Sequence, residues 1–289
     1  YSLLTEDLAE AARLLPDTRN AEKARVTGIA AYTLLAKVYL TFGKHAEART
    51  ALDEAMKATG YGLESTTKRV FDINNKMNKE VIFALYYNKT NDNGHGYWYS
   101  TNTDVMADIR NPTPEFKAIY DESDNRLALI DTYTKIQSNL FAMTKWYDTY
   151  DATYTTQVGN DFPHLRYADI TLMYAEALAE TDLPTALTWL NKTRIRAGLD
   201  ELTLDDVKTK AEFIRELAAE RGREFALEGH RWFDLVRLGL AVDYFREMGY
   251  SLDSHNLIFP IPQNQIEIVN NPSILWQLSL IHISEPTRP

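Results

Sequence analysis

The chain has 289 residues, 45% of them hydrophobic, with a formal net charge of −10 at pH 7 and no cysteine. This length can bury one sizeable core, and the acidic balance argues against a nucleic-acid partner, which needs a basic surface. The lack of cysteine excludes disulfides, thiol chemistry and cysteine-based zinc sites. No apolar run approaches the ~20 residues of a membrane span.

Two stretches have the apolar periodicity of paired helices. Glu22 to Thr59 breaks near Gly43, and Tyr167 to Gly198 breaks near Pro184. Small residues at such spacing resemble a tetratricopeptide repeat, in which two helices pack closely. We therefore predict a mainly all-α fold, with tetratricopeptide-like helical hairpins, long irregular loops and little sheet.

The helical periodicity fades over residues 61–163, which we predict to be a loop-rich lobe of one domain covering residues 1–277. Two aromatic clusters lie in this lobe. Flat aromatic faces stack on the C–H surfaces of sugars, and amide groups pair with sugar hydroxyls. Alternatively, the rings fill the core beneath the loops. The candidate ligand-binding residues are Asn93, Tyr97, Trp98, Tyr99, Trp146 and Tyr147.

The stretch from Arg215 to Gly239 has helical spacing but carries charges on its apolar face. An isolated buried ion is costly, so these charges must be paired. They could form an anion or acid/base site, but the alternation of Glu and Arg at pairing distance favours a structural ion-pair lattice. No nucleophile, metal-ligand pair or Gly-rich loop accompanies them, so we predict no catalytic residue, metal or cofactor. The candidate lattice residues are Arg221, Glu224, Glu228, Arg231, Asp234 and Arg237.

The same stretch resembles the C-terminal signature of the SusD/RagB family, and further segments match that family in the same order. They are Leu4–Asp17, Pro112–Leu127, Asp161–Leu178, Ala186–Leu199 and Leu257–Pro272. The resemblance implies a non-catalytic, lipid-anchored protein of the outer-membrane surface of Bacteroidota. Such a protein captures oligo- or polysaccharide, or in some relatives peptide, for a SusC-like TonB-dependent transporter. The family's ligand loops are variable, so no ligand residue carries over.

The two ends of the sequence prompt separate interpretations. The resemblance implies a fragment that lacks the N-terminal part, with its export signal and acylated cysteine. Residues 278–289 depart from the family's closing sequence, and we interpret them as a non-native tail.

Two other functions stay open. A helical-repeat adaptor without ligand capture is the first alternative. A glycoside hydrolase ranks last, since only scattered carboxylates such as Asp148, Asp151 and Asp161 could serve it.

Overall fold

The computed structural model describes residues 1–16, 25–87, 100–102, 113–131, 133–137, 140–146, 159–258 and 261–271. The chain divides into two compact units, Tyr1–Arg231 and Trp232–Pro289. The boundaries of the predicted single domain stay a prediction.

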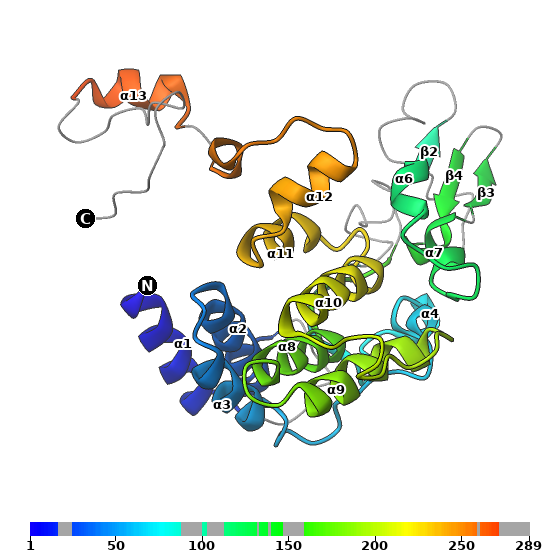
Figure 1. Ribbon diagram of the computed structural model, residues 1–289, viewed down its shortest axis with the longest axis horizontal. Coiled ribbons are helices and arrows are strands. Elements are labelled where there is room, and N and C mark those ends of the chain that lie inside the picture. The colour runs from blue at the N-terminus through cyan, green and yellow to red at the C-terminus, as the bar shows by residue number, and fades with distance from the viewer. Residues whose placement is uncertain are drawn as a thin grey trace. The chain divides into compact units, whose positions relative to one another are not determined.

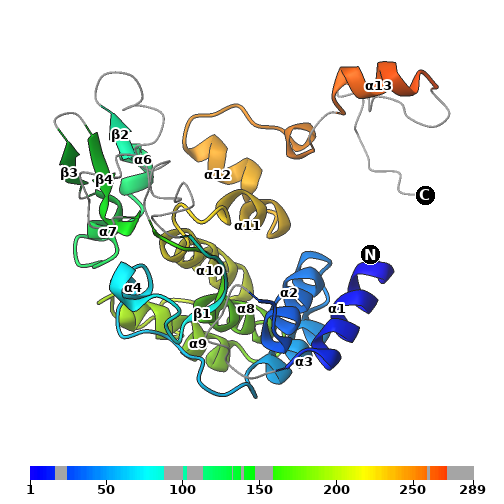
Figure 2. The same cartoon turned by 180° about the vertical axis from the view of Figure 1, so that it is seen from behind.

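The first unit is built mainly from stacked helices (Figure 1, Figure 2). The neighbours α2 and α3 form one hairpin, and α8 and α9 form another, with α3 packed on α8 and α10 packed on both α8 and α9. The predicted hairpins and the mainly helical fold are confirmed. The helices are α1 (Ser2–Leu14), α2 (Gly28–Thr41), α3 (His45–Ala55), α8 (Tyr167–Leu178), α9 (Leu183–Arg196) and α10 (Lys210–Glu224).

Local sequence signals explain where the second hairpin turns and ends. The side chain of Asp182 accepts a hydrogen bond from the Thr185 backbone N–H, which caps the start of α9. Gly198 follows α9 with φ of +84°, and a Cβ there would lie 3.3 Å from the Ser123 carbonyl oxygen. Glycine therefore suits this position on both counts. Alanines with no exposed surface, such as Ala36, Ala48 and Ala175, let the helices approach closely.

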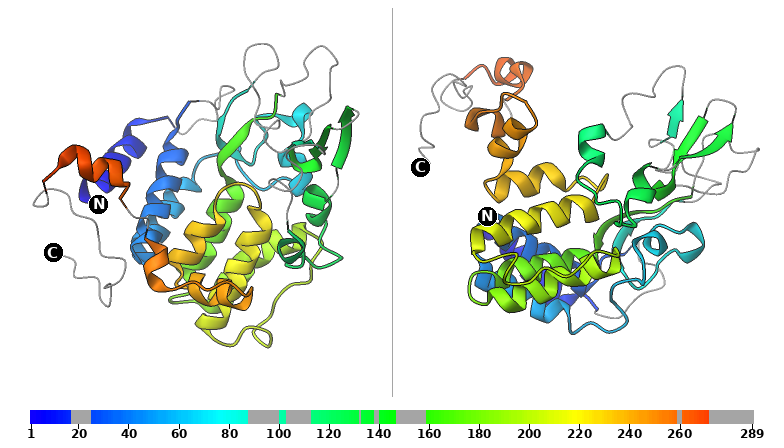
Figure 3. Two further views of the ribbon diagram at one scale, coloured as in Figure 1. Left: turned by 90° about the horizontal axis from the view of Figure 1, so that it is seen from above. Right: turned by 45° about the vertical axis from the view of Figure 1, so that its right-hand side comes forward.

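The lobe between the hairpins contains two small antiparallel sheets. In the first, β1 (Val81–Leu85) pairs with β5 (Phe162–Arg166), and Leu85 lies opposite Phe162. The second has the order β2-β4-β3, and Figure 3 shows it outside the stack of helices. Its strands are β2 (Ser100–Asn102), β3 (Tyr133–Gln137) and β4 (Leu140–Met143). The short helices of the lobe are α4 (Thr67–Val70), η1 (Ile73–Asn75), α6 (Pro114–Lys117), α7 (Leu127–Asp131) and η3 (Thr144–Trp146).

The charged stretch that carries the family signature is split between two helices. The first, α10, ends at Glu224, and α11 (Arg231–Arg237) begins after Gly229, whose φ is +83°. The second unit continues with α12 (Ala241–Glu247), η4 (Ser254–Leu257) and α13 (Gln263–Val269). None of the helices in the described ranges is long and apolar enough to span a bilayer.

Candidate functional site

Three glutamates spaced four residues apart form the centre of a buried ionic network. Glu220 and Glu224 lie on α10, and Glu228 lies in the turn that follows it. None is more than 6% exposed. Burial opposes ionisation of each carboxyl, but the surrounding cations outweigh it and lower the pKa of all three. The three side chains are therefore carboxylates at neutral pH.

Arg126 connects the loop-rich lobe to this acidic row. Its guanidinium lies 2.7 Å from Glu220, 3.0 Å from Glu224 and 2.8 Å from Asp124. Arg126 is only 1% exposed, so water cannot stabilise its positive charge and these carboxylates must compensate it. Its contacts hold the segment before α7 against α10.

Arg166, at the end of β5, makes a second set of contacts to the row. It lies 2.8 Å from Glu80, 2.5 Å from Glu224 and 2.8 Å from Glu228. Lys145 lies 2.8 Å from Glu228 and donates a hydrogen bond of 2.5 Å to the Ala226 carbonyl oxygen. Burial lowers the pKa of Lys145 even though Glu228 opposes the shift.

Arg196 on α9 completes the network by pairing with both Glu80 and Glu224. Segments far apart in the sequence, from Glu80 to Arg196, therefore meet at the C-terminal end of α10. The arrangement satisfies buried charges with opposite charges and backbone groups, which is what a structural ion-pair lattice requires.

A smaller charged cluster surrounds Asp169 on α8. Arg221 lies 3.1 Å and Lys37 2.8 Å from its carboxylate, and His230 Nδ1 lies 3.4 Å from Lys37 Nζ. Burial opposes ionisation of Asp169, but the two cations outweigh it and hold its pKa below the usual range. Burial lowers the pKa of His230 to about 4 despite the nearby Asp169, so its ring is neutral at pH 7.

The other predicted lattice residues, Arg231, Asp234 and Arg237, make contacts separate from those of the three glutamates. Arg231 is half-buried and donates a hydrogen bond to the Ala218 carbonyl oxygen at 2.5 Å. A Cβ at position 222 would lie 2.7 Å from the Arg231 guanidinium, so Gly222 leaves space for it. In the second unit, buried Asp234 pairs with Arg237 at 2.8 Å. The structural role of these residues stays a prediction.

Sequence analysis did not identify Glu80, Lys145, Arg166, Arg196 and Glu220 as members of the network, or Asp169 as the partner of Arg221. The sequence indicates Asp124 and Arg126 only as a lock within their own loop, and the structure adds the contacts of Arg126 to Glu220 and Glu224. Glu220 carried a local signal, because it lies four residues before Glu224 on the same helical face.

The structure places the predicted ligand residue Trp146 in a core cluster. It is 1% exposed, its ring centroid lies 5.1 Å from Phe71, and it stacks on Phe162 at 5.6 Å. This corrects its assignment to an open sugar platform, because neighbouring rings already cover it. The other candidates, Asn93, Tyr97, Trp98, Tyr99 and Tyr147, lie outside the described residues.

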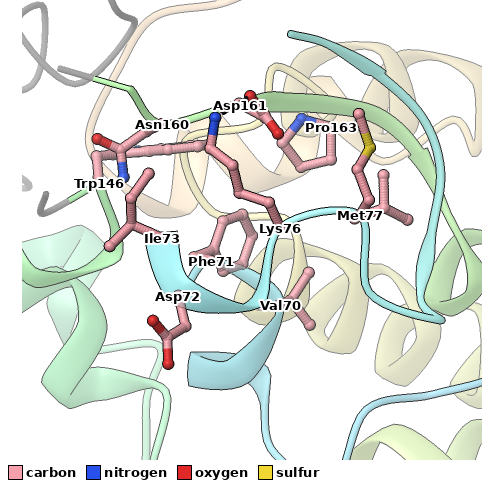
Figure 4. Close-up of a pocket in the computed structure, with 11 residues that line it drawn as sticks. Val70, Phe71, Asp72, Ile73, Lys76, Met77, Trp146, Asn160, Asp161 and Pro163 are labelled. Carbon is pink, nitrogen blue, oxygen red and sulfur yellow. Dashed lines mark hydrogen bonds and ion pairs between the residues drawn. The ribbon is translucent and has the colours of Figure 1, made fainter. Parts of the chain in front are cut away.

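A small cavity lies beside Trp146, lined by residues from α4, η1 and β5 (Figure 4). Its volume of about 20 Å³ suits about one water molecule and is far too small for a sugar. Lys76 extends along this cavity towards Asp161, and their charged groups lie 2.8 Å apart. Asp161, one of the carboxylates considered for glycoside hydrolysis, is therefore held in an ion pair, while Asp148 and Asp151 lie outside the described residues.

Stacked helical hairpins joined to a loop-rich lobe define the class: a helical-repeat protein of the tetratricopeptide-like type. The model of the SusD family matches residues 120–278. The chain belongs to the SusD family.

Individual relatives agree with this assignment. SusD-like protein P2 from Formosa agariphila is 26% identical over 95% of this chain and 63% of its own length. The chain thus spans less than two thirds of that relative. Among solved structures, surface glycan-binding protein A from Bacteroides thetaiotaomicron has a TM-score of 0.74 at 20% identity, covering 94% of this chain and 68% of its own. A laminarin binding SusD-like protein has a TM-score of 0.69 at 26% identity, covering 91% of this chain and 66% of its own.

Proposed function

We propose that the protein captures a glycan at the outer-membrane surface, without cleaving it, and passes it to a SusC-like TonB-dependent transporter. The observation that carries the proposal is membership of the SusD family together with the laminarin binding relative, which is 26% identical to this chain over 91% of its residues. Surface glycan-binding protein A in complex with laminarihexaose has the same fold, with a TM-score of 0.73.

The topology of the first sheet supports a common ligand site for the two aromatic clusters. Residues 88–99 follow β1, and residues 147–158 precede β5. Because β1 and β5 are antiparallel, the end of β1 lies beside the start of β5, with Leu85 opposite Phe162. Both clusters are therefore attached at the same end of the sheet. We propose that Asn93, Tyr97, Trp98, Tyr99 and Tyr147 supply ligand contacts there.

Binding without turnover tests this proposal directly. The purified protein should bind laminarin or another neutral glycan saturably in isothermal titration calorimetry. It should release no new reducing ends from that glycan during prolonged incubation. Failure to bind any member of a broad panel of neutral glycans would contradict glycan capture. Steady release of reducing ends would favour a glycoside hydrolase instead.

An open groove on α9 favours the adaptor as the second candidate. The groove, of about 360 Å³, runs between α9 and residues 201–204, and the exposed side chains Ile195 and Leu204 line it. Exposed apolar side chains in a groove suit a protein partner. If the protein binds the glycan and also co-purifies with a transporter, capture and delivery are supported. A stable protein complex from a chain that binds no glycan would favour the adaptor.

A further inference from the structure

We propose that Tyr86 is a residue on which a neutral sugar stacks, that Lys76 and Asp161 fix the adjacent backbone of Tyr87, and that Lys76 supports the Tyr86 ring. The inference rests on the proposed function and places one contact of that function on the described part of the chain. Tyr86 directly follows β1 and is 50% exposed. Val81, Ile82 and Ala84 of β1 are buried, whereas Leu85, the last residue of the strand, is 43% exposed. The chain thus leaves the core at Leu85 and Tyr86.

The backbone beside this ring is fixed by two side chains from distant segments. Lys76 donates a hydrogen bond to the Tyr87 carbonyl oxygen at 2.7 Å. Asp161 accepts one from the Tyr87 N–H at 3.0 Å. Lys76 and Asp161 also pair with each other at 2.8 Å, and both are largely shielded from solvent. The direction in which the chain leaves β1 is therefore set before any ligand binds.

One face of the Tyr86 ring is already occupied. The Lys76 ammonium lies 4.5 Å from the ring centroid, a cation–π distance. No other ring of the described residues packs against Tyr86. An aromatic ring held from behind by a cation loses little conformational freedom when a sugar stacks on its remaining exposed surface.

A hydrogen-bond acceptor lies close to this ring. Both hydrogen bonds that Asp161 accepts go to Oδ1, so Oδ2 takes none from the described residues. Lys76 bridges the two groups, since its Nζ contacts both the ring and Oδ1. Oδ2 can accept a hydrogen bond from a hydroxyl group of a sugar bound against Tyr86. A stacking surface beside a hydroxyl acceptor is the pairing that sugar recognition requires.

Charge defines the class of glycan. Lys76 and Asp161 neutralise each other, so no unpaired cation of this pair would attract an anionic sugar. The chain as a whole carries a net charge of −10, which repels polyanions. The geometry thus points to neutral hexose units, as in laminarin, rather than to uronic acids or sulfated sugars.

Titration calorimetry with laminarin tests the assignment. Tyr86→Ala and Tyr86→Leu should each weaken binding about tenfold, the scale of one lost aromatic contact. Tyr86→Phe keeps the ring and should bind within about twofold of the wild type on the same scale. Tyr250→Ala is the control, because Tyr250 is a similarly exposed tyrosine, at 58%, in the second unit, and it should bind like the wild type. Melting temperatures of all four variants establish that they are folded.

The outcomes separate the inference from the function on which it rests. If the wild type binds laminarin or another neutral glycan and folded Tyr86→Leu binds equally well, Tyr86 is not a contact and glycan capture stands. If the wild type binds no neutral glycan, glycan capture itself fails. Alginate, a polyuronic acid, should not compete with the neutral glycan. Equal competition by alginate would overturn the assignment to neutral sugars.

Discussion

Glu228→Ala should destabilise the first unit strongly, because two buried cations share this carboxylate. Glu228 accepts hydrogen bonds from Arg166 Nε at 2.8 Å and Nη2 at 2.9 Å, and from Lys145 Nζ at 2.8 Å. After the substitution, Arg166 keeps Glu80 and Glu224. Among the described residues, Lys145 keeps one hydrogen bond, to the Ala226 carbonyl oxygen, and its contact with the Phe71 ring, but no carboxylate. The larger part of the penalty therefore falls on Lys145.

The size of the effect follows from the cost of an orphaned buried charge. Removing one partner of a buried ion pair costs about 3–5 kcal/mol of unfolding free energy. For a unit of this size, that corresponds to a fall in melting temperature of about 6–20 °C. Lys145→Met combined with Glu228→Leu removes both charges, so the double variant should lose less stability than the two single variants added together.

Chemical denaturation and thermal melting would measure these differences. The matched control is Glu54→Ala, which breaks the solvent-exposed pair with Lys57 and should leave the melting temperature unchanged. If the Glu228→Ala protein melts at the same temperature as the Glu54→Ala protein, the conclusion that Glu228 stabilises the fold by compensating buried cations is wrong. Simple additivity in the double variant would show that Lys145 and Glu228 do not act as a pair.

Three further predictions concern pH, the core and the loops. The pKa of His230 is about 4 when folded and about 6.5 when unfolded, so the unfolded chain binds more protons between these values. Unfolding free energy should therefore fall as pH drops from 6.5 to 4, and His230→Gln should remove up to about 3 kcal/mol of that loss in denaturation curves taken across this range. Trp146→Ala should lower the unfolding free energy, measured in urea, by about 3–5 kcal/mol, because Trp146 fills a core cluster. An unchanged urea midpoint would show that Trp146 is not a core residue. Trp98→Ala should weaken glycan binding by about 1–3 kcal/mol in calorimetry without lowering the melting temperature, whereas a variant that chiefly unfolds would place Trp98 in the core.

The partners of the buried charges show where prediction from sequence stops. Apolar spacing on a helix is a local property, so it revealed that Arg221, Glu224 and Glu228 interrupt a buried face and must be paired. It could not name Arg166 and Lys145, which lie 62 and 83 positions from Glu228. Those contacts depend on how distant segments pack.

The sequence by itself determined the helical hairpins and the break of the first hairpin at Gly43, whose φ is +68°, because periodicity and positive-φ glycines act over a few residues. Its ordered motifs also indicated the family. Only the tertiary structure decided which aromatic rings are buried and which are exposed, since a ring's environment comes from segments far away in the chain. Trp146 and Tyr86 illustrate this: the first is enclosed by Phe71 and Phe162, and the second stands at the surface, held by Lys76.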